Sequence, residues 1–170
     1  MKNFHNILYI SYNSLEEPLS KSQVLSYLKG LEKDGFRAIL LTFEKKIDKE
    51  KFFRSKENLS KNGIEWHWLK YHKRPKLLAA FFDIFAGFFY SLKLTWKNSA
   101  LIVHARSYVP AVIGLMVKFA KGPKLVFDMR GLLADDYVEG GLMKKRGISY
   151  VVTKKLENIL INSSDRVVVL

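Results

Sequence analysis

Short apolar runs alternate along this chain with segments of helical periodicity. The runs 7–12 and 37–43 contain almost no polar interruption, which predicts two buried strands. Between them, apolar residues recur at helical spacing at Val24, Leu25, Leu28 and Leu31. Ser20 and Gln23 have the spacing of a capping box, and Gly35 is placed to supply a left-handed helix end. The pattern therefore predicts a strand, a helix and a second strand.

The same alternation continues to the end of the sequence. Further strands are predicted at 64–69, 101–103, 123–127 and 166–170, and helices at 76–96, from about 108 to Gly122-Pro123, and at 148–161. Polar and apolar residues alternate in 64–69, which predicts an exposed edge strand. The stretches 45–62 and 132–147 are predicted to be irregular. Strands separated by helices indicate a doubly wound α/β domain over residues 1–170, with a parallel sheet and helices on both faces.

Composition narrows the class of protein. Apolar residues make up 48% of the chain and aromatic residues 14%, which excludes a disordered segment. Cysteine is absent, which fits a reducing compartment and excludes a disulfide framework. The start of the sequence shows no signal-peptide pattern, so we expect a cytoplasmic protein.

The net charge of +13 is concentrated in two places. Residues 45–76 contain 11 Lys or Arg against 4 Asp or Glu. A second group consists of Lys144, Lys145, Arg146, Lys154 and Lys155. Such charge either attracts anionic lipid, nucleic acid or phosphorylated substrates, or simply forms a solvated surface.

The apolar segment 77–92 contains five phenylalanines, with a lysine at each end. Its 16 residues would rise about 24 Å as a helix, short of the ~30 Å core of a bilayer, and Asp83 lies inside it. A membrane span is therefore not expected. Packing in the core and a position in the lipid interface both remain open.

Candidate chemistry gathers where strands end, because ligands of open α/β sheets bind at the carboxyl edge. Asp128, Arg130 and Gly131 directly follow a buried strand, and His104, Arg106 and Ser107 end another. A structural salt bridge is the alternative for the charged pair. The loop after the first strand has no glycine, and Glu16 and Glu17 would repel a phosphate, so a polyol suits it better than a dinucleotide. Helix-start charges are the alternative for these two residues.

Three loops resemble the N-terminal half of a GT-B glycosyltransferase of the GT4 (group 1) family: residues 12–25, 104–108 and 127–131. The resemblance implies a Rossmann-like acceptor domain facing a second, donor-binding domain of the same polypeptide, and transfer with retention and without a metal ion. It implies catalytic roles for Asp128 and Arg130. Acceptor or sugar contacts are implied for Ser14, Leu15, Glu16, Gln23, His104, Arg106, Ser107 and Gly131. The sequence departs from the family in its glycine-free first loop and in having Asp128 where histidine is common.

This resemblance also implies the partners. The co-substrate would be a UDP- or GDP-sugar with no prosthetic group, and the acceptor a glycan or a lipid-linked molecule. We expect the present chain to be inactive alone, and the intact enzyme to be cytoplasmic, with the basic surface resting on the inner face of the plasma membrane. The four histidines lack the spacing of a metal site. A basic module that binds nucleic acid is the alternative, with Phe52, Phe53, Trp66, Trp68 and Tyr71 as stacking candidates; no nucleic acid partner is expected.

Overall fold

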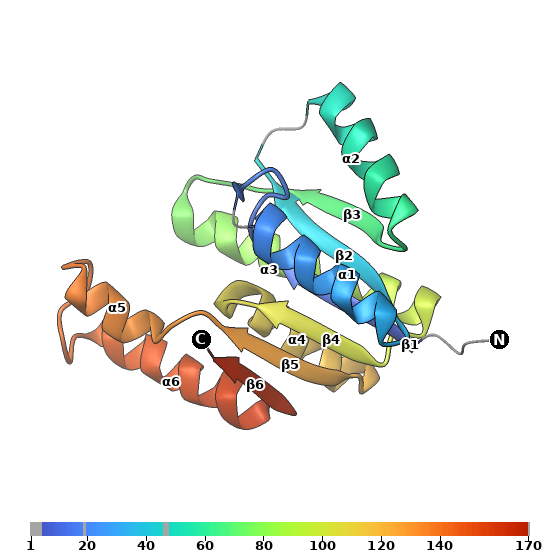
Figure 1. The fold of residues 1–170 in the computed structure, drawn as a ribbon. Coiled ribbons are helices and arrows are strands. Elements are labelled where there is room, and N and C mark those ends of the chain that lie inside the picture. The colour runs from blue at the N-terminus through green and yellow to red at the C-terminus, as the bar shows by residue number, and fades with distance from the viewer. Residues whose placement is uncertain (1–4, 19, 46–47, 170) are drawn as a thin grey trace.

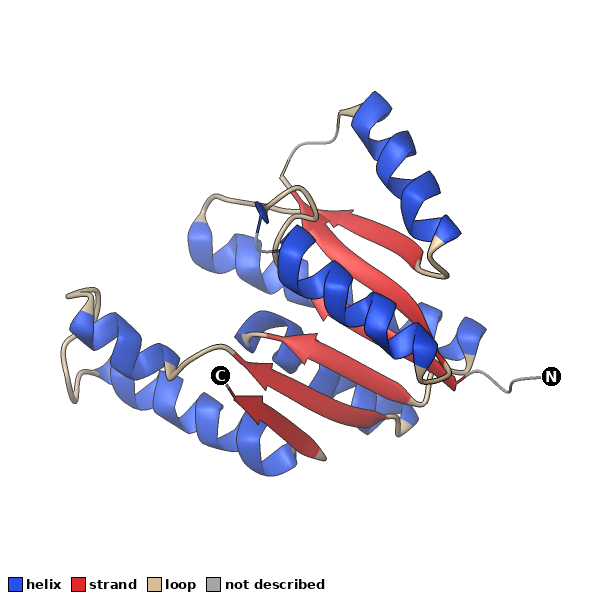
Figure 2. Cartoon of the chain, viewed as in Figure 1, coloured by secondary structure: helices blue, strands red, loops and turns tan. Residues whose placement is uncertain are grey.

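A parallel β-sheet forms the centre of the protein. The computed structural model describes residues 5–18, 20–45 and 48–169. Within them, six strands pair in the order β3-β2-β1-β4-β5-β6, all parallel. They are β1 (His5–Ser11), β2 (Phe36–Glu44), β3 (Glu65–Lys70), β4 (Ile102–Arg106), β5 (Lys124–Met129) and β6 (Arg166–Val169). Figure 2 shows all the arrows pointing the same way, so the carboxyl ends share one edge of the sheet.

Helices cover both faces of this sheet. They are α1 (Leu25–Lys33), entered through a π-helical turn (Ser20–Val24), α2 (Lys49–Lys61), α3 (Lys76–Asn98), α4 (Tyr108–Lys121), α5 (Leu133–Glu139) and α6 (Ile148–Ser163). One face is covered by α1 and α2, and the other by α3, α4 and α6 (Figure 1). The predicted fold class, a doubly wound α/β sheet with helices on both faces, is confirmed.

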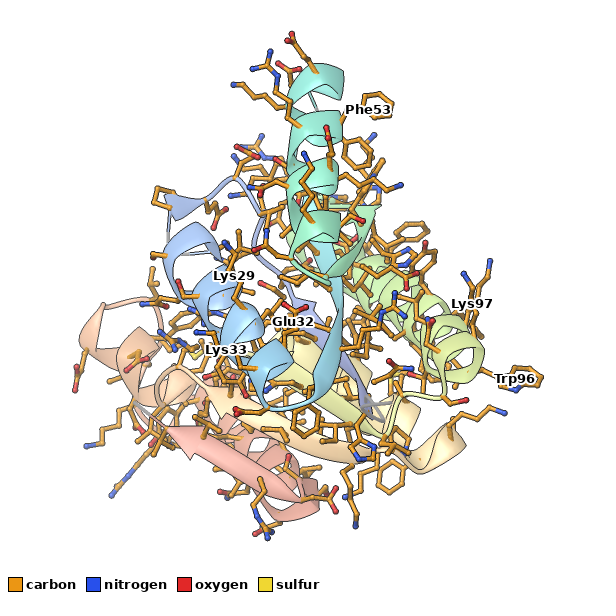
Figure 3. All side chains as sticks on the ribbon, turned by 45° about the vertical axis from the view of Figure 1, so that its right-hand side comes forward. Lys29, Glu32, Lys33, Phe53, Trp96 and Lys97 are labelled. Carbon is orange, nitrogen blue, oxygen red and sulfur yellow. The ribbon has the colours of Figure 1, made fainter. Side chains whose placement is uncertain are left out.

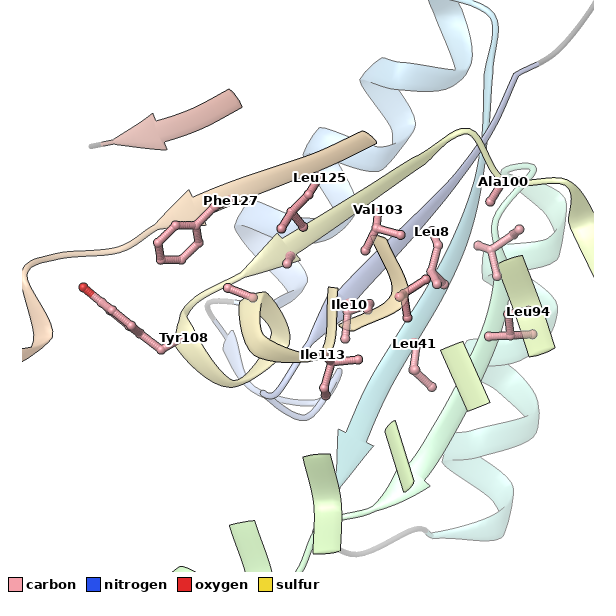
Figure 4. Close-up of a cluster of buried hydrophobic side chains, with 14 of the residues drawn as sticks. Leu8, Ile10, Leu41, Leu94, Ala100, Val103, Tyr108, Ile113, Leu125 and Phe127 are labelled. Carbon is pink, nitrogen blue, oxygen red and sulfur yellow. The ribbon is translucent and has the colours of Figure 1, made fainter. Parts of the chain in front are cut away.

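Two apolar cores follow from the two-residue period of the strands. Leu8 and Ile10 of β1 point toward α3 and α4, and Figure 4 shows them among Val103, Leu125 and Ile113. Ile7 and Tyr9, one residue out of phase, pack instead against α1 and α2. Because both faces are buried, the central strands are apolar without alternation, as their sequence indicates.

The edge position of β3 and the left-handed conformation of Gly35, with φ of 85°, are as predicted. The two stretches that were predicted to be irregular each contain a helix. Residues 45–62 contain α2, whose N-cap Asp48 accepts hydrogen bonds from the N–H groups of Glu50 and Lys51. Residues 132–147 contain the short helix α5. Helix α2 was missed because only three of its 13 residues are apolar, and α5 because seven residues are too few for helical periodicity to show.

The predicted capping box is wrong. The N–H of Ser20 donates to the carbonyl of Glu17, and the side-chain oxygen of Gln23 accepts hydrogen bonds from two arginines instead. The chain enters α1 through a π-helical turn, in which the capping-box geometry is not formed.

The apolar helix is also longer than predicted. It extends to Asn98, and 21 of its 23 residues, Leu78–Asn98, are long and apolar enough to cross a membrane by length and composition. The length argument against a span therefore does not hold for α3 as formed. At the other end of the chain, Leu170 of the predicted strand 166–170 lies outside the described residues.

Candidate functional site

The candidate site lies at the carboxyl edge of β1, β4 and β5. Arg106 pairs with Ser11 on one side and with Asp128 on the other, so these three residues stand at the same level of the sheet. The His104 ring stacks on Tyr9, with 4.6 Å between ring centroids, which places it on the face covered by α1. Sheet pairing thus brings together the histidine, arginine and aspartate that the sequence predicted at strand ends.

The Asp128 carboxylate lies between two guanidinium groups. Nη1 of Arg106 is 3.6 Å from Oδ2, and Nη1 of Arg130 is 3.6 Å from Oδ1. The Nη2 atoms of both arginines donate to Oε1 of Gln23, at 2.5 Å from Arg106 and 3.0 Å from Arg130. A single amide therefore holds both cations beside the carboxylate.

Burial alone would raise the pKa of Asp128, since it penalises the charged form. The His104 ring and the guanidinium groups of Arg106 and Arg130 outweigh burial, so the pKa is lowered below its ordinary value. His104 lies 3.8 Å away, beyond an ordinary hydrogen bond, so we attribute most of the effect to the positive charges. Asp128 is therefore ionised at neutral pH.

His104 is almost fully buried, yet only one of its ring nitrogens is engaged. Nδ1 lies 3.4 Å from the Tyr27 hydroxyl. Nε2, within the described part of the chain, has no hydrogen-bond partner. Because a buried polar atom without a partner is costly, this nitrogen is a natural contact for a ligand hydroxyl or a water molecule.

These side chains line a pocket of about 310 Å³. Its lining consists of Tyr9, Gln23, Tyr27, His104, Arg106, Asp128, Arg130 and Val168. Burial raises the pKa of Tyr9 to about 12, and burial followed by the charge of Asp128 raises the pKa of Tyr27, so both phenols are neutral hydrogen-bonding groups. A carboxylate, two guanidiniums, an imidazole and two phenols in one pocket suit a polyol that carries a negative group.

Tyr9 and Tyr27 were not predicted as site residues. Tyr27 lies four positions after Gln23, one helical turn along, so a helix-face argument from Gln23 could have found it. Tyr9 sits inside an apolar run and carried no signal in the sequence.

The first loop is anchored to the sheet by its own predicted site residues. Ser14 and Leu15 are buried, and the Glu44 carboxylate accepts from the Ser14 hydroxyl and, at 2.9 Å, from the Leu15 N–H. Glu17 accepts from Lys45 at 2.8 Å, and this bond lowers the pKa of Glu17. Ser55 of α2 donates to Glu16 at 3.3 Å. These contacts fix the loop, and acceptor contacts by Ser14, Leu15 and Glu16 stay predictions.

Ser107 and Gly131 shape the backbone next to Asp128. Ser107 has φ of 72° and ψ of −179°, a conformation that glycine adopts far more readily, and its N–H donates to the carbonyl of Asp128 at 2.9 Å. The Tyr108 hydroxyl donates to the Glu157 carboxylate at 2.7 Å, and its oxygen lies 2.9 Å from the Gly131 carbonyl oxygen. The loop that carries Arg130 is thereby tied to α4 and α6.

Two further predictions concern metal ions and the stacking of bases. Among the described residues, no group of three or more His, Asp or Glu side chains is arranged to hold a metal ion. Of the predicted base-stacking aromatics, Trp66 is buried and donates its indole N–H to Thr42 at 2.9 Å. Phe52 packs on Trp66 with ring centroids 5.0 Å apart, so these two rings serve the packing of α2 on β3.

An all-parallel sheet with helices on both faces is a Rossmann-like α/β fold, and this arrangement matches that of GT-B domains. No protein-family model matches the sequence, and no curated protein matches it.

Solved structures share the fold at low sequence identity. UGT2 of Phytolacca americana, complexed with UDP-2fluoro-glucose and pterostilbene, superposes with a TM-score of 0.70 at 8% identity over 98% of this chain and 48% of that one. Sucrose-phosphate synthase from Thermosynechococcus elongatus gives 0.64 at 12%, over 96% of this chain and 41% of that one. A putative UDP-N-acetylglucosamine 2-epimerase from Listeria monocytogenes gives 0.60 at 11%, over 96% and 39%. The chain thus spans less than half the length of each.

Proposed function

We propose that this chain is the acceptor-side domain of a glycosyltransferase that moves a sugar from a UDP- or GDP-sugar to a glycan or lipid-linked acceptor. Two of the structural neighbours support a transferase, since one is a complex with UDP-2fluoro-glucose and the other is a sucrose-phosphate synthase. The three loops that resemble the GT4 family favour retention of configuration without a metal ion. In this proposal a second domain of the intact cytoplasmic enzyme binds the donor, and the present chain alone does not catalyse transfer.

One observation carries the proposal. The ionised Asp128 carboxylate, bracketed by Arg106 and Arg130, lines the same pocket as His104, whose Nε2 has no hydrogen-bond partner among the described residues. Hydrogen-bond acceptors of this kind orient sugar hydroxyls, whereas a pocket for an uncharged apolar ligand would have no use for three charged side chains.

The chemistry assigned to these residues is positional and electrostatic. Asp128 accepts a hydrogen bond from an acceptor hydroxyl and holds it toward the anomeric carbon of the donor. Arg130 and Arg106 present forked donors to a phosphate group, either on the acceptor or on the departing nucleotide. Gln23 keeps both guanidinium groups in place in the absence of ligand.

The test is nucleotide-sugar consumption by the natural full-length gene product and by this chain, against a panel of UDP- and GDP-sugars. We expect activity with one donor in the long form only. In that form, Asp128→Asn should lower kcat/KM at least a hundredfold, because it removes the charged acceptor and leaves the shape of the side chain. Glu57→Gln, a fully exposed site on α2, is the matched control and should leave the rate unchanged.

Two outcomes would contradict the proposal. One is an unchanged rate with Asp128→Asn. The other is a long form that consumes no donor but binds nucleic acid with an affinity that falls steeply with salt, as counterion release requires. The second outcome would favour a basic nucleic-acid-binding module.

A further inference from the structure

Helix α3 carries a continuous stripe of exposed apolar side chains. Its members, each more than half exposed, are Leu78, Phe81, Phe82, Phe85 and Phe89. Their spacing of three and four residues places them on one face of the helix, pointing away from the sheet. Soluble proteins seldom expose so many large apolar side chains together unless the surface binds something.

The opposite face of α3 belongs to the protein core. Ala79, Asp83 and Leu94 are buried, and a side chain at Gly87 would collide with Ile113 of α4. Because α3 lies flat against α4 and the sheet, it cannot cross a bilayer while the domain is folded, although its length and composition would suffice. A helix in this position can only lie in the membrane interface.

Positive charges frame the stripe at both ends. Lys70, Lys73 and Arg74 are exposed before the helix begins, and Lys93 and Lys97 are exposed near its end. Figure 3 shows Lys97 and Trp96 projecting outward from that end. The only acidic residue of α3 is Asp83, which is 1% exposed. The outward surface of α3 is therefore apolar and cationic.

Asp83 connects the basic loop to the helix. Oδ1 lies 2.6 Å from Nδ1 of His72, and Oδ2 accepts from the His72 backbone N–H at 3.1 Å and from the Tyr12 hydroxyl at 2.7 Å. The His72 ring also lies edge-on to Phe82, with centroids 4.9 Å apart. Lys73 and Arg74 thus follow directly from a residue that is fixed to α3, and the loop and the stripe form one surface.

We infer that this surface, the α3 stripe with loop 72–74, docks on an anionic lipid bilayer. Its charge is complementary to anionic headgroups, and its rings are of the kind that enter the headgroup region. A second protein would need acidic side chains at two separate places to face the lysines at both ends of the stripe. An anionic bilayer presents negative headgroups over its whole surface, so it faces both ends at once.

The orientation also bears on the acceptor. Helix α3 begins at the carboxyl edge of the sheet, the edge at which Asp128 lies (Figure 1). The apolar stripe occupies the part of α3 nearest this edge, so docking through it holds the carboxyl edge rather than the opposite edge toward the membrane, where the headgroup of a lipid-linked acceptor would be located. This second step, that the acceptor is lipid-linked, rests on the proposed glycosyltransferase function.

The experiment is co-sedimentation of the protein with vesicles of phosphatidylcholine, with and without about 30% phosphatidylglycerol, which gives the surface the negative potential that attracts basic segments. We expect binding to the anionic vesicles, weakened at least tenfold by Phe81→Ser with Phe85→Ser, and likewise by Lys73→Glu with Arg74→Glu. Circular dichroism confirms that each variant is folded.

Matched controls lie elsewhere on the domain. Leu142→Ser with Ile148→Ser removes two apolar side chains that are more exposed than Phe81 and Phe85, one in the loop after α5 and one at the start of α6. Lys29→Glu with Lys33→Glu makes the same charge change on α1, which covers the other face (Figure 3). Both pairs should bind vesicles as the wild type does.

Three results would overturn the inference: no binding to anionic vesicles, equal loss in the controls, or a wild-type dimer in sedimentation velocity that the Phe81 and Phe85 changes dissociate. Because vesicle binding needs no sugar donor, it is judged separately from catalysis. Transfer to soluble but not to lipid-linked acceptors would refute the acceptor assignment and leave the proposed function standing.

Discussion

Arg106 and Asp128 stand opposite each other on neighbouring strands, and Nη1 of Arg106 lies 3.6 Å from Oδ2 of Asp128. The strands are 22 positions apart in sequence at these residues, and only their pairing brings the charges together. The pair lies at the centre of the candidate site, so its electrostatics can be tested before any substrate is known.

Replacing Arg106 with Gln should raise the pKa of Asp128. Burial raises the pKa of Asp128, and without the Arg106 guanidinium less positive charge remains to counteract this effect. Arg106→Lys keeps the charge and should leave the pKa lowered, and Arg37→Gln at the other edge of the sheet should have no effect. Carbon-13 NMR titration of the aspartate carboxyls measures all three. An Asp128 pKa that stays the same in Arg106→Gln would show that Arg106 does not lower it.

Asp165 should make the fold sensitive to acid. Lys118 donates to it at 2.7 Å, and with the Leu125 N–H and Lys124 this holds the pKa of Asp165 well below its ordinary value. A lowered folded-state pKa adds stability above the unfolded value of about 4, and that stability is lost as the pH falls through the folded value. Asp165→Asn should cost about 1–3 kcal/mol at pH 7 and progressively less in acid. Urea unfolding of both proteins between about pH 2 and 7, a range that includes the unfolded-state pKa of aspartate, measures this difference in the free energy of unfolding.

The acid prediction has an internal control in Glu57, whose pKa is also lowered by a lysine, Lys61, but which is fully exposed. Solvent screens such a pair, so Glu57→Gln should hardly change the urea midpoint at any pH. A constant difference between wild type and Asp165→Asn across the pH range would refute the linkage.

The Tyr108 hydroxyl should contribute measurably to stability. It donates to the carboxylate of buried Glu157, lies 2.9 Å from the Gly131 carbonyl oxygen, and accepts from the Leu133 N–H at 3.2 Å. Tyr108→Phe leaves the buried carboxylate short of a partner and should cost about 1–3 kcal/mol in denaturant unfolding. Tyr137→Phe, an exposed tyrosine of α5, should cost less than about 0.5 kcal/mol. Equal costs in the two variants would argue against the network.

Ser107→Gly should stabilise the fold. Ser107 has φ of 72° with an extended ψ, a region that costs a residue with a Cβ about 1–3 kcal/mol. Relief of that strain should exceed the extra chain entropy of glycine, for a net gain of about 1 kcal/mol. Ser99→Gly, at the left-handed end of α3 with φ of 49°, relieves less strain and should gain less. Thermal unfolding compares the two, and a loss of stability in Ser107→Gly would contradict the strained conformation.

Gly87→Ala should destabilise the packing of α3 on α4. A Cβ at this position would lie 2.6 Å from Cδ1 of Ile113 and 2.9 Å from Cζ of Phe43, so the core must shift at a cost of about 1–3 kcal/mol. Gly30→Ala is the matched control, since its Cβ would meet nothing within 4 Å. That change should instead stabilise α1 by up to about 1 kcal/mol through helix propensity. Chemical denaturation that ranked the two in the opposite order would contradict the close helix contact.

Much of the fold could be predicted because strands and core helices leave recognisable patterns in the local sequence. Continuous apolar runs mark strands buried on both faces, and apolar residues at a spacing of 3.6 mark core helices; both patterns follow from local backbone geometry. Helix α2 was not predicted because it lies in a largely charged segment from which only Phe52 and Leu59 pack into the core. Its N-cap, Asp48, was the one local signal, and it was not recognised.

The candidate site, like the fold, was predicted in part from the sequence. By itself, the sequence determined that His104, Arg106, Asp128 and Arg130 lie toward the carboxyl edge of the sheet, because an apolar run that stops at charged residues marks such an edge. The strands themselves run further than predicted, so His104 lies within β4 and Asp128 within β5. Only the tertiary structure decided that Gln23, 83 positions before Arg106, holds both guanidiniums, and that Ser14 and Leu15 are anchored by Glu44. Those partners depend on β1 lying between β2 and β4, and strand order arises from the packing of the whole chain, which no local pattern encodes.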